Sequence, residues 1–333
     1  MSGSVALIIV NYRTADLTLA CLESLRAEVG AFSDFQVFVV DNASGDGSVE
    51  KLGEAVRREN WDRWVQVVPS QRNGGFAAGN NIGLKEVFKY GDCFDYVVLL
   101  NPDTVARNGA VLALIQFMEE NPLAGIAGSR LEDAQGVVEC SAHTAHSPLG
   151  ELESSARLGP LSRMLRRYVV SPPPRESQHR CEWVSGASLV VRRKVIEAIG
   201  GLDEGFFLYF EEVDFCTRAR KAGWEVWFVP ESRIVHLEGA STGVQAVNKR
   251  RPRYWYDSRR RYFVKHFGWV GLMVADILWA VGRASLVMRL AFKRGPHTRP
   301  PGPRFFAWDL LWGDFRSLFG GEVIRVKRRS AAS

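Results

Sequence analysis

The sequence is poor in cysteine, and its few cysteines are poorly placed to act together. Five occur among 333 residues, scattered from Cys21 to Cys216, and no two of them form a Cys-x-x-Cys pair. An odd number at irregular spacing argues against a disulfide framework, and the absence of close pairs argues against a structural zinc site. The cysteine content therefore fits a protein of a reducing compartment.

Several familiar motifs are missing as well. There is no Gly-x-x-x-x-Gly-Lys-Ser/Thr segment, which excludes a Walker A site. There is no Gly-x-Gly-x-x-Gly after the first apolar run, so the sequence lacks the main motif that would indicate a dinucleotide-dependent dehydrogenase. The apolar stretch at residues 4–10 is too short for a signal peptide, and we expect a cytoplasmic protein.

Basic residues are concentrated at one end of the chain. Residues 240–333 contain 19 Lys and Arg against 5 Asp and Glu, whereas residues 1–239 contain 24 against 32. An acidic body with a basic tail predicts that the tail meets an anionic partner. Residues 249–266 interleave basic and aromatic side chains, a pattern suited either to a nucleic-acid strand or to phosphate head groups at a membrane.

No long apolar run is free of charge. Residues 269–292 are mostly apolar but contain Asp276, Arg283 and Arg289, whereas a membrane span needs about 20 apolar residues with few charges. Asp276 and Arg283 are seven residues apart and so share one helical face. This favours an amphipathic helix lying on a membrane; a helix packed on the catalytic domain and a true span are the alternatives.

The first hundred residues alternate apolar runs with polar loops and helical patterns. Predicted strands are residues 5–10, 35–40, 65–69 and 96–100. Predicted helices follow at about 16–26, at 48–59 and toward Tyr90. Continuous apolar runs suit strands buried on both faces. The alternation predicts an α/β fold with a doubly wound, mostly parallel sheet and helices on both faces.

Beyond residue 103 the pattern is less regular. Further strands are expected at 125–130, 183–191, 225–229 and 234–236. Helices are expected at 110–119 and, after the run at 201–215, through Ala222. Residues 141–180 contain several prolines and are expected to form loops. From residue 246 we expect a helical extension that is basic and aromatic.

Polar residues follow the early strands at the edge where α/β sheets bind ligands. Asp41 could accept hydrogen bonds from a base or ribose, although loops rich in Asp, Asn, Gly and Ser are often only loops. Asp103 could bind a divalent cation shared with phosphate oxygens. Asn101-Pro102-Asp103-Thr104 also suits an ordinary turn with a cap.

A second acidic centre is Glu211-Glu212-Val213-Asp214. Three carboxylates in four residues, flanked by aromatic side chains, should raise at least one pKa, and a raised pKa suits a general base. The alternative is the acidic first turn of a helix. His236, after a short apolar strand, is either a structural residue or a metal ligand.

Seven motifs occur in a fixed order along the chain. They are Val-Asn-Tyr, Val-Val-Asp-Asn-Ala-Ser, Asn-Gly-Gly-Phe-Ala-Ala-Gly-Asn-Asn, Leu-Asn-Pro-Asp, Gly-Ala-Ser-Leu-Val-Val-Arg-Arg, Gly-Leu-Asp-Glu-Gly-Phe-Phe-Leu-Tyr-Phe-Glu-Glu-Val-Asp-Phe and Val-His-Leu-Glu-Gly-Ala-Ser-Thr. Together they resemble family 2 glycosyltransferases, in particular the bacterial rhamnosyltransferase-like branch related to galactofuranosyltransferases. The match covers residues 4–245, and an Arg/Tyr motif extends it to about 267.

The resemblance implies a GT-A fold and inverting transfer from a nucleotide-diphosphate sugar, with Mn²⁺ or Mg²⁺. It assigns donor binding to Asn11, Tyr12, Arg13, Asp41, Asn73, Gly74, Asn80, Asn101 and Asp103. It makes Asp103 and His236 metal ligands, and Glu212 the base, supported by Glu211 and Asp214. Two departures stand out. Asn101 replaces the first acid of the DXD motif, and the base position holds Glu where many relatives have Asp.

The resemblance also divides the chain. Residues 1–245 would be the catalytic domain, with a nucleotide-sugar half to about 130 and an acceptor half to 245. Residues 246–333 would bind the membrane or the acceptor. The expected donor is a dTDP- or UDP-sugar, rhamnose being one candidate, and the expected acceptor is a cell-envelope or polyprenyl-diphosphate-linked glycan.

We further expect association with the inner face of the cell membrane through residues 249–292, and no nucleic-acid partner. The alternatives are a nucleotide-binding or nucleotidyltransferase-like protein with a nucleic-acid-binding tail, and a non-catalytic scaffold of the same fold.

Overall fold

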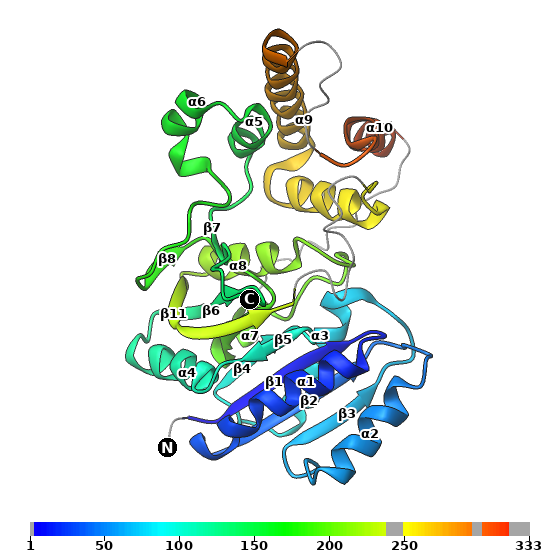
Figure 1. Ribbon diagram of the computed structural model, residues 1–333, viewed down its shortest axis with the longest axis vertical. Coiled ribbons are helices and arrows are strands. Elements are labelled where there is room, and N and C mark those ends of the chain that lie inside the picture. Colours follow the sequence, from blue (N-terminus) through cyan, green and yellow to red (C-terminus); the bar gives the residue numbers. More distant parts are fainter. Residues whose placement is uncertain (1–2, 238–248, 295–301, 320–333) are drawn as a thin grey trace, which may run out of the picture. The chain divides into compact units, whose positions relative to one another are not determined.

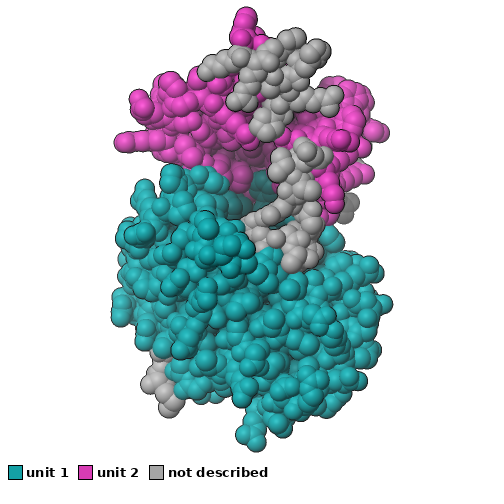
Figure 2. All heavy atoms as spheres, viewed as in Figure 1, with its two compact units in different colours: residues 1–145, 171–245 teal, residues 146–170, 246–333 magenta. Residues whose placement is uncertain are grey.

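The structure is a computed structural model that describes residues 3–237, 249–294 and 302–319. Motif residues 238–242 and the basic end at 327–329 lie outside the described residues. The chain divides into two compact units, coloured separately in Figure 2. The first comprises residues 1–145 and 171–245, and the second comprises residues 146–170 and 246–333.

The first unit is built on a nine-stranded sheet (Figure 1). The strands lie in the order β3 (Val65–Pro69), β2 (Phe35–Asp41), β1 (Val5–Asn11), β4 (Tyr96–Leu100), β10 (Ser188–Arg192), β6 (Ala124–Glu132), β11 (Glu225–His236) and β5 (Thr104–Ala106). The short strand β8 (His179–Cys181) also pairs with β11. Two further strands, β7 (Ala142–His143) and β9 (Trp183–Val184), pair separately.

Helices cover both faces of the sheet. Residues of α1 (Ala15–Leu25), α2 (Ser48–Arg58) and α4 (Ala110–Glu120) share one core with Val5, Leu7 and Ile9 of β1. On the other face, α3 (Gly75–Lys89) approaches Ile8 and Val10 closely through its glycines. Successive strand residues point to opposite faces, so β1 is buried on both sides, as its continuous apolar run predicted. The remaining helices of this unit are a 3₁₀ turn (Arg26–Ala31), α7 (Arg193–Ile199) and α8 (Glu211–Lys221).

The doubly wound α/β fold is confirmed, with changes in detail. Strands β3, β2, β1 and β4 are parallel, but β10 runs antiparallel to both of its neighbours, so the second half of the sheet is mixed. The strand expected at 183–191 is divided into β9 and β10. The strands expected at 225–229 and 234–236 are one strand, β11, with an irregularity between Val229 and Arg233.

The second unit is helical. It contains α5 (Pro148–Ala156), α6 (Gly159–Met164), a 3₁₀ turn (Arg166–Tyr168), α9 (Arg253–Arg294) and α10 (Phe306–Phe319). The expectation that residues 141–180 are all loop is therefore wrong. Pro148 occupies the first turn of α5, where a missing N–H costs nothing, and the Ser147 hydroxyl accepts a hydrogen bond from Gly150 N at 3.1 Å. These residues begin a helix, and α5 packs on α9.

Helix α9 has one face packed and the other exposed. Gly268 interrupts it with non-helical angles (φ 71°, ψ 178°). Beyond this kink, buried side chains include Leu272, Ala275, Trp279 and Leu286, whereas Val270, Ile277, Val281 and Met288 are exposed. By length and composition α9 could cross a membrane, which is weak evidence by itself. The packed face of α9 meets α5 and α10 of the same unit.

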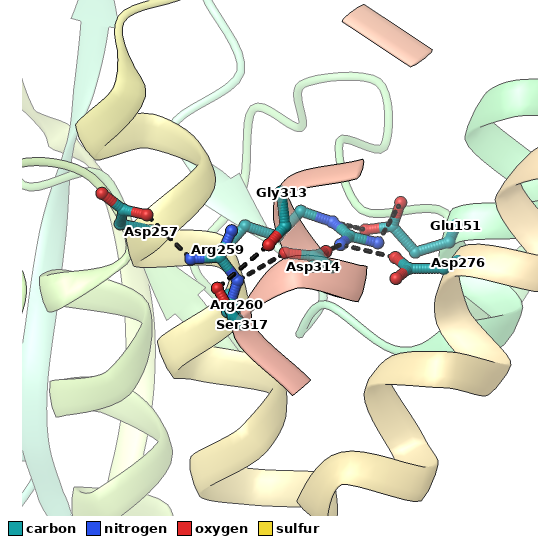
Figure 3. A network of polar contacts seen from close by, with 8 residues as sticks. All are labelled: Glu151, Asp257, Arg259, Arg260, Asp276, Gly313, Asp314 and Ser317. Carbon is teal, nitrogen blue, oxygen red and sulfur yellow. Dashed lines mark hydrogen bonds and ion pairs between the residues drawn. The ribbon is translucent and has the colours of Figure 1, made fainter. Parts of the chain in front are cut away.

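Three charged residues of α9, Arg259, Arg260 and Asp276, are buried. The Arg259 guanidinium contacts Asp276 at 2.9 Å, Asp314 at 3.2 Å and Glu151 at 3.3 Å, and Arg260 donates to Asp314 at 2.6 Å (Figure 3). Burial raises the pKa of Asp276 to about 7 against the opposing effect of Arg259. This network joins α5, both parts of α9, and α10, so removing one partner would leave an uncompensated buried charge.

Close packing of β6 gives a test of the fold. A Cβ added to Gly128 would lie 2.4 Å from Val184 Cβ, so Gly128→Ala should lower the free energy of unfolding by about 1–3 kcal/mol. The control is Gly53→Ala within α2, where the nearest atom lies 3.7 Å away; it should raise stability by about 0.5–1 kcal/mol. Urea unfolding measures both, and equal changes in the two variants would contradict the packing.

Candidate active site

The ends of β1 and β2 form a polar cradle. Asn11 and Asp41 are paired in the sheet, and Asn11 Nδ2 donates to Asp41 Oδ1 at 2.7 Å. The Ser44 hydroxyl and backbone N–H donate to the two oxygens of Asp41, at 2.6 and 3.0 Å. The structure thus brings Asn11 and Asp41 together as predicted, and adds Ser44, which belongs to the same Asp-Asn-Ala-Ser motif.

The loop after β1 is held in a sparsely populated conformation. Arg13 has φ 58°, and its N–H donates to Ser44 Oγ at 2.9 Å. Opposite it, Ala43 has φ 57°. Such left-handed residues cost free energy and cluster at functional sites. Tyr12 is 40% exposed, with the Arg13 guanidinium 5.2 Å from its ring centre, which leaves an aromatic surface beside the cradle.

The glycine-rich loop is fixed to this cradle by Asn42. The Asn42 amide donates to Asn73 Oδ1 and to Gly75 O, both at 3.0 Å, and Gly74 N–H donates back to Asn42 Oδ1 at 3.4 Å. Asn42 had no role assigned from the sequence, although it stands directly after Asp41. Its side chain makes Asn73 and Gly74 neighbours of the strand ends.

The same loop contacts the segment that precedes α8. Phe76 N–H donates to Phe207 O at 2.8 Å, and Gly75 has φ 83°. A Cβ on Gly75 would lie 2.0 Å from Phe207 O. Only glycine allows this approach, so the glycine-rich motif positions the loop that carries the acidic pair.

The two asparagines of α3 behave differently. Asn80 is buried and donates to Phe76 O at 2.9 Å, while its Oδ1 has no hydrogen-bond partner among the described residues. Asn81 accepts from Leu202 N–H and donates to Leu202 O, each at 2.9 Å. Asn80 therefore retains an acceptor for a ligand. Asn81, which the sequence did not single out, anchors the loop at residues 201–204.

Asp103 and His236 meet at the edge formed by β5 and β11. Thr104 pairs with His236 in the sheet, and Leu237 N–H donates to Asp103 O at 2.9 Å. The imidazole Nε2 lies 3.5 Å from Asp103 Oδ1. Asn101 is held nearby, where its N–H donates to Ala187 O at 2.9 Å. The Asn-Pro-Asp-Thr segment is a turn, as the alternative predicted, but one that places Asp103 against His236.

This pair suits part of a divalent-metal site. A carboxylate oxygen and an imidazole nitrogen are both accepted by Mn²⁺. Among the described residues, no group of three or more His, Cys, Asp or Glu side chains gathers to hold a metal ion. Asp103 and His236 could supply two ligands of a cation, and oxygens of a bound diphosphate could supply others.

The acidic pair begins α8. Tyr209 and Phe210, which precede it, have φ 70° and 68°, a strained entry for non-glycine residues. Glu211 is buried and Glu212 half-buried, and the Oε2 atoms of both lack a hydrogen-bond partner in the described part of the chain. Burial raises the pKa of Glu212 to about 7. Burial, then the charge of Glu212, raises the pKa of Glu211 well above its ordinary value.

Asp214 does not join this pair. It is fully buried, and its Oδ2 accepts from Arg218 Nε at 2.8 Å. Arg218 also donates to Ile199 O and Gly201 O, at 2.8 and 2.7 Å. Asp214 thus fixes the loop before α8 through Arg218, whereas Glu211 and Glu212 each keep one carboxylate oxygen without a hydrogen-bond partner in the described part of the chain.

The short segment just before β10 borders both acidic centres. A Cβ on Gly186 would lie 3.6 Å from Glu212 Cβ and 3.7 Å from the Phe76 ring. The next residue, Ala187, accepts the hydrogen bond from Asn101. The segment before β10 therefore separates Glu212 from the turn that carries Asp103.

A sequence model described as "Glycosyltransferase like family 2" matches residues 2–258. The chain belongs to the family 2 glycosyltransferases. This confirms the resemblance. This glycosyltransferase is 29% identical over 269 residues to N-acetylglucosaminyl-diphospho-decaprenol L-rhamnosyltransferase of Mycobacterium tuberculosis, covering 76% of the chain and 81% of the relative. It is 25% identical over 198 residues to rhamnosyltransferase WbbL of Escherichia coli K12, covering 59% and 66%.

Solved structures show the fold of this glycosyltransferase. Mannosyltransferase PcManGT from Pyrobaculum calidifontis, in complex with GDP-Man and Mn²⁺, aligns with a TM-score of 0.52 at 17% identity, over 94% of the chain and 80% of that structure. GalNAc-T7 with UDP, GalNAc and Mn²⁺ aligns with a TM-score of 0.54 at 14% identity, over 79% and 51%. The expected GT-A fold is confirmed.

The Gly75 contact can be tested against a matched glycine. Gly75 and Gly136 share φ 83°, so Ala at either position carries a backbone strain of about 1–2 kcal/mol. Only at Gly75 does the new Cβ also meet a backbone atom; none lies within 4 Å at Gly136. Gly75→Ala should lower glycosyl transfer at least about tenfold, because it displaces the loop before α8. Gly136→Ala should stay within about twofold of wild type, and equal losses would contradict the assigned contact.

Proposed function

We propose that this glycosyltransferase is a metal-dependent, inverting enzyme that uses a dTDP- or UDP-sugar, rhamnose being the first candidate. The observation that carries the proposal is the position of Glu212, whose pKa burial raises to about 7: it lies against Gly186, next to Ala187, which accepts the hydrogen bond from Asn101 in the turn that bears Asp103. The mycobacterial relative named above is a rhamnosyltransferase, which favours that sugar.

The donor lies along the carboxyl ends of the strands. Asp41 accepts hydrogen bonds from the base or ribose, and Asn11 can donate to them. The exposed ring of Tyr12 stacks on the base. Arg13, Asn73, Gly74 and Asn80 border the rest of the nucleotide sugar. Asp103 and His236 would hold the divalent cation, and a cation bound there would neutralise the charge of the departing diphosphate. Asn101 lies beside them with an amide in place of a carboxylate.

Glu212 acts as the general base. Its carboxylate takes the proton of an acceptor hydroxyl while that oxygen forms a bond to the anomeric carbon. The bond from this carbon to the diphosphate oxygen breaks on the opposite face, and the configuration inverts. A pKa near 7 makes the carboxylate basic enough to remove the proton yet still ionised in a useful fraction at neutral pH. Burial of Glu212 keeps that pKa raised, and Asp214 fixes the loop before α8 through Arg218.

The acceptor is a glycan linked to a membrane lipid. The mycobacterial relative acts, by its name, on a sugar attached to diphospho-decaprenol. The second unit exposes an apolar stripe that includes Val270, Ile277, Val281 and Met288. This stripe would lie on the inner face of the cell membrane, while the charged residues Arg259, Arg260 and Asp276 remain inside the unit.

The assignment of Glu212 as the base predicts different effects of the same substitution at two neighbouring glutamates. Glu212→Gln keeps size and hydrogen-bonding groups but cannot accept the proton, so kcat should fall at least about a thousandfold. Binding of UDP or dTDP with Mn²⁺, measured by calorimetry, should stay within about twofold. Glu211→Gln is the matched variant and should keep most of the activity. A total loss in Glu211→Gln with turnover retained in Glu212→Gln would overturn the assignment.

The missing carboxylate at position 101 predicts weak metal binding. Asn101→Asp restores a second acid beside Asp103 and should lower the Mn²⁺ concentration for half-maximal binding about tenfold, measured by calorimetry with nucleotide present. Asn60→Asp, on an exposed turn, makes the same chemical change away from the site and should have no effect. An unchanged or weaker metal affinity in Asn101→Asp would contradict the assigned metal position.

A further inference from the structure

Three arginines surround a single carboxylate at the edge of the sheet. Glu132, the last residue of β6, is fully buried. Arg233 on β11 donates to both of its oxygens, from Nε at 2.8 Å and from Nη2 at 3.2 Å. Arg130 Nε lies 3.1 Å from Glu132 Oε1, and Arg107 Nη2 lies 3.8 Å from Oε2. The reaction described above uses none of these four side chains.

This arginine cluster carries more positive than negative charge. Glu132 is the one acidic side chain that contacts the three guanidinium groups in the part of the chain that the structure describes. The hydrogen bond from Arg233 lowers the pKa of Glu132, which therefore stays ionised, so three positive charges share one negative charge. The side chains of Arg107 and Arg233 are 52% and 51% exposed. Guanidinium groups that repel one another are stabilised by an added anion, and these two can reach one in solution.

The arginine cluster lies near the proposed metal position. Thr104 and His236 form the last pair between β5 and β11. Past the other end of the same pairing, Arg107 N–H donates to Arg233 O at 3.0 Å. Arg233 precedes His236 by three residues, which is about 10 Å along a strand. The arginines are therefore close to the place where the departing diphosphate is proposed to lie, without forming that place themselves.

The cluster also shares a face of the sheet with the proposed base. Residues two apart on a strand point to the same face, so Arg130 lies on the face to which Gly128 belongs. On this face a Cβ on Gly128 would meet Val184 of β9, and a Cβ on Gly186, two residues farther, would lie 3.6 Å from Glu212 Cβ. A ligand on this face could therefore contact both the cluster and the base.

The proposed reaction has to accommodate two diphosphates. One belongs to the nucleotide sugar. The other belongs to the lipid-linked acceptor: in the acceptor for which the mycobacterial relative is named, a diphosphate joins N-acetylglucosamine to decaprenol. When that sugar receives the transferred one, its diphosphate is one sugar ring away from the reacting hydroxyl. Two diphosphates at such a distance repel each other, so the second needs cations of its own. Arginine suits this need because it stays charged and binds phosphate oxygens through paired N–H donors.

We propose that Arg107, Arg130 and Arg233 bind the diphosphate of a lipid-linked acceptor, and that Glu132 holds their guanidinium groups in place. This inference rests on the proposed function, since it places the head group of the proposed acceptor. Arg107 is the most informative position to change. It contacts Glu132 only at 3.8 Å, so its replacement leaves the buried carboxylate paired with Arg233.

The test uses the full-length protein with the donor site filled by UDP and Mn²⁺. The probe is N-acetylglucosaminyl octyl diphosphate, and its affinity is measured by calorimetry. Arg107→Gln should bind it at least about fivefold more weakly, because one charge-assisted contact is lost. The control is Arg26→Gln, the same change at a 67% exposed arginine that contacts Glu23 at 3.4 Å, and it should stay within about twofold of wild type. Unchanged affinity in Arg107→Gln, or equal losses in the two variants, would overturn the proposal.

Two further titrations identify the source of the anion. Pyrophosphate offers the same anion without the sugar and the chain, and it should bind wild type at least about tenfold more weakly than the probe. Equal affinities would overturn the acceptor assignment. UDP with Mn²⁺ should bind Arg107→Gln within about twofold of wild type. A loss as large as that of the probe would place Arg107 at the donor's diphosphate and would also overturn the proposal.

The failure of this inference can be told apart from the failure of the proposed function. The titrations do not depend on turnover, so a wild-type protein that transfers no sugar while Arg107→Gln still loses affinity for the probe would defeat the proposed function alone. Sugar transfer by wild type, together with unchanged probe affinity in Arg107→Gln, would defeat this inference alone.

Discussion

Two carboxylates kept away from water are the feature on which the site depends. Burying an ionised carboxylate without a partner is costly, and the folded protein reduces that cost by raising the pKa of Glu211 and Glu212. The surrounding structure also supports the strained residues Tyr209 and Phe210, which aim the first turn of α8. The packing of the sheet and its two helical layers offsets the free-energy cost of these buried carboxylates and strained residues.

One set of loop contacts connects the acidic pair to the strand ends. Asn42 holds the glycine-rich loop, and Gly75 brings that loop against Phe207, just before α8. Any shift of the loop would therefore move both the strand ends proposed to bind the nucleotide and the proposed base. Two-metal nucleotidyl transfer uses clustered carboxylates, which differ from the side chains described at the proposed metal position. Here Asp103 is accompanied by His236 and an asparagine.

The sequence predicted the parallel half of the sheet because each of its strands is an apolar run ended by polar residues. It also placed Asn11 beside Asp41, since parallel strands end at one edge. It failed where local signals were ambiguous: Pro148 was read as a loop residue but starts a helix. The sequence also did not show which basic residue pairs with which acidic one. Asp214 looked like part of the acidic centre, and only the fold shows that Arg218 takes it. Likewise, the inward turn of Asp276 depends on the distant Arg259.

The central claim is that the fold keeps the Glu212 carboxyl protonated up to neutral pH. Carbon-13 NMR of proteins labelled at the glutamate side-chain carboxyl measures this directly, through a pH titration of wild type and Glu212→Gln. We predict one resonance with an apparent midpoint near 7 that is absent from the variant. If every resonance lost by the substitution titrates near the ordinary value of 4.5, the account of the site is wrong.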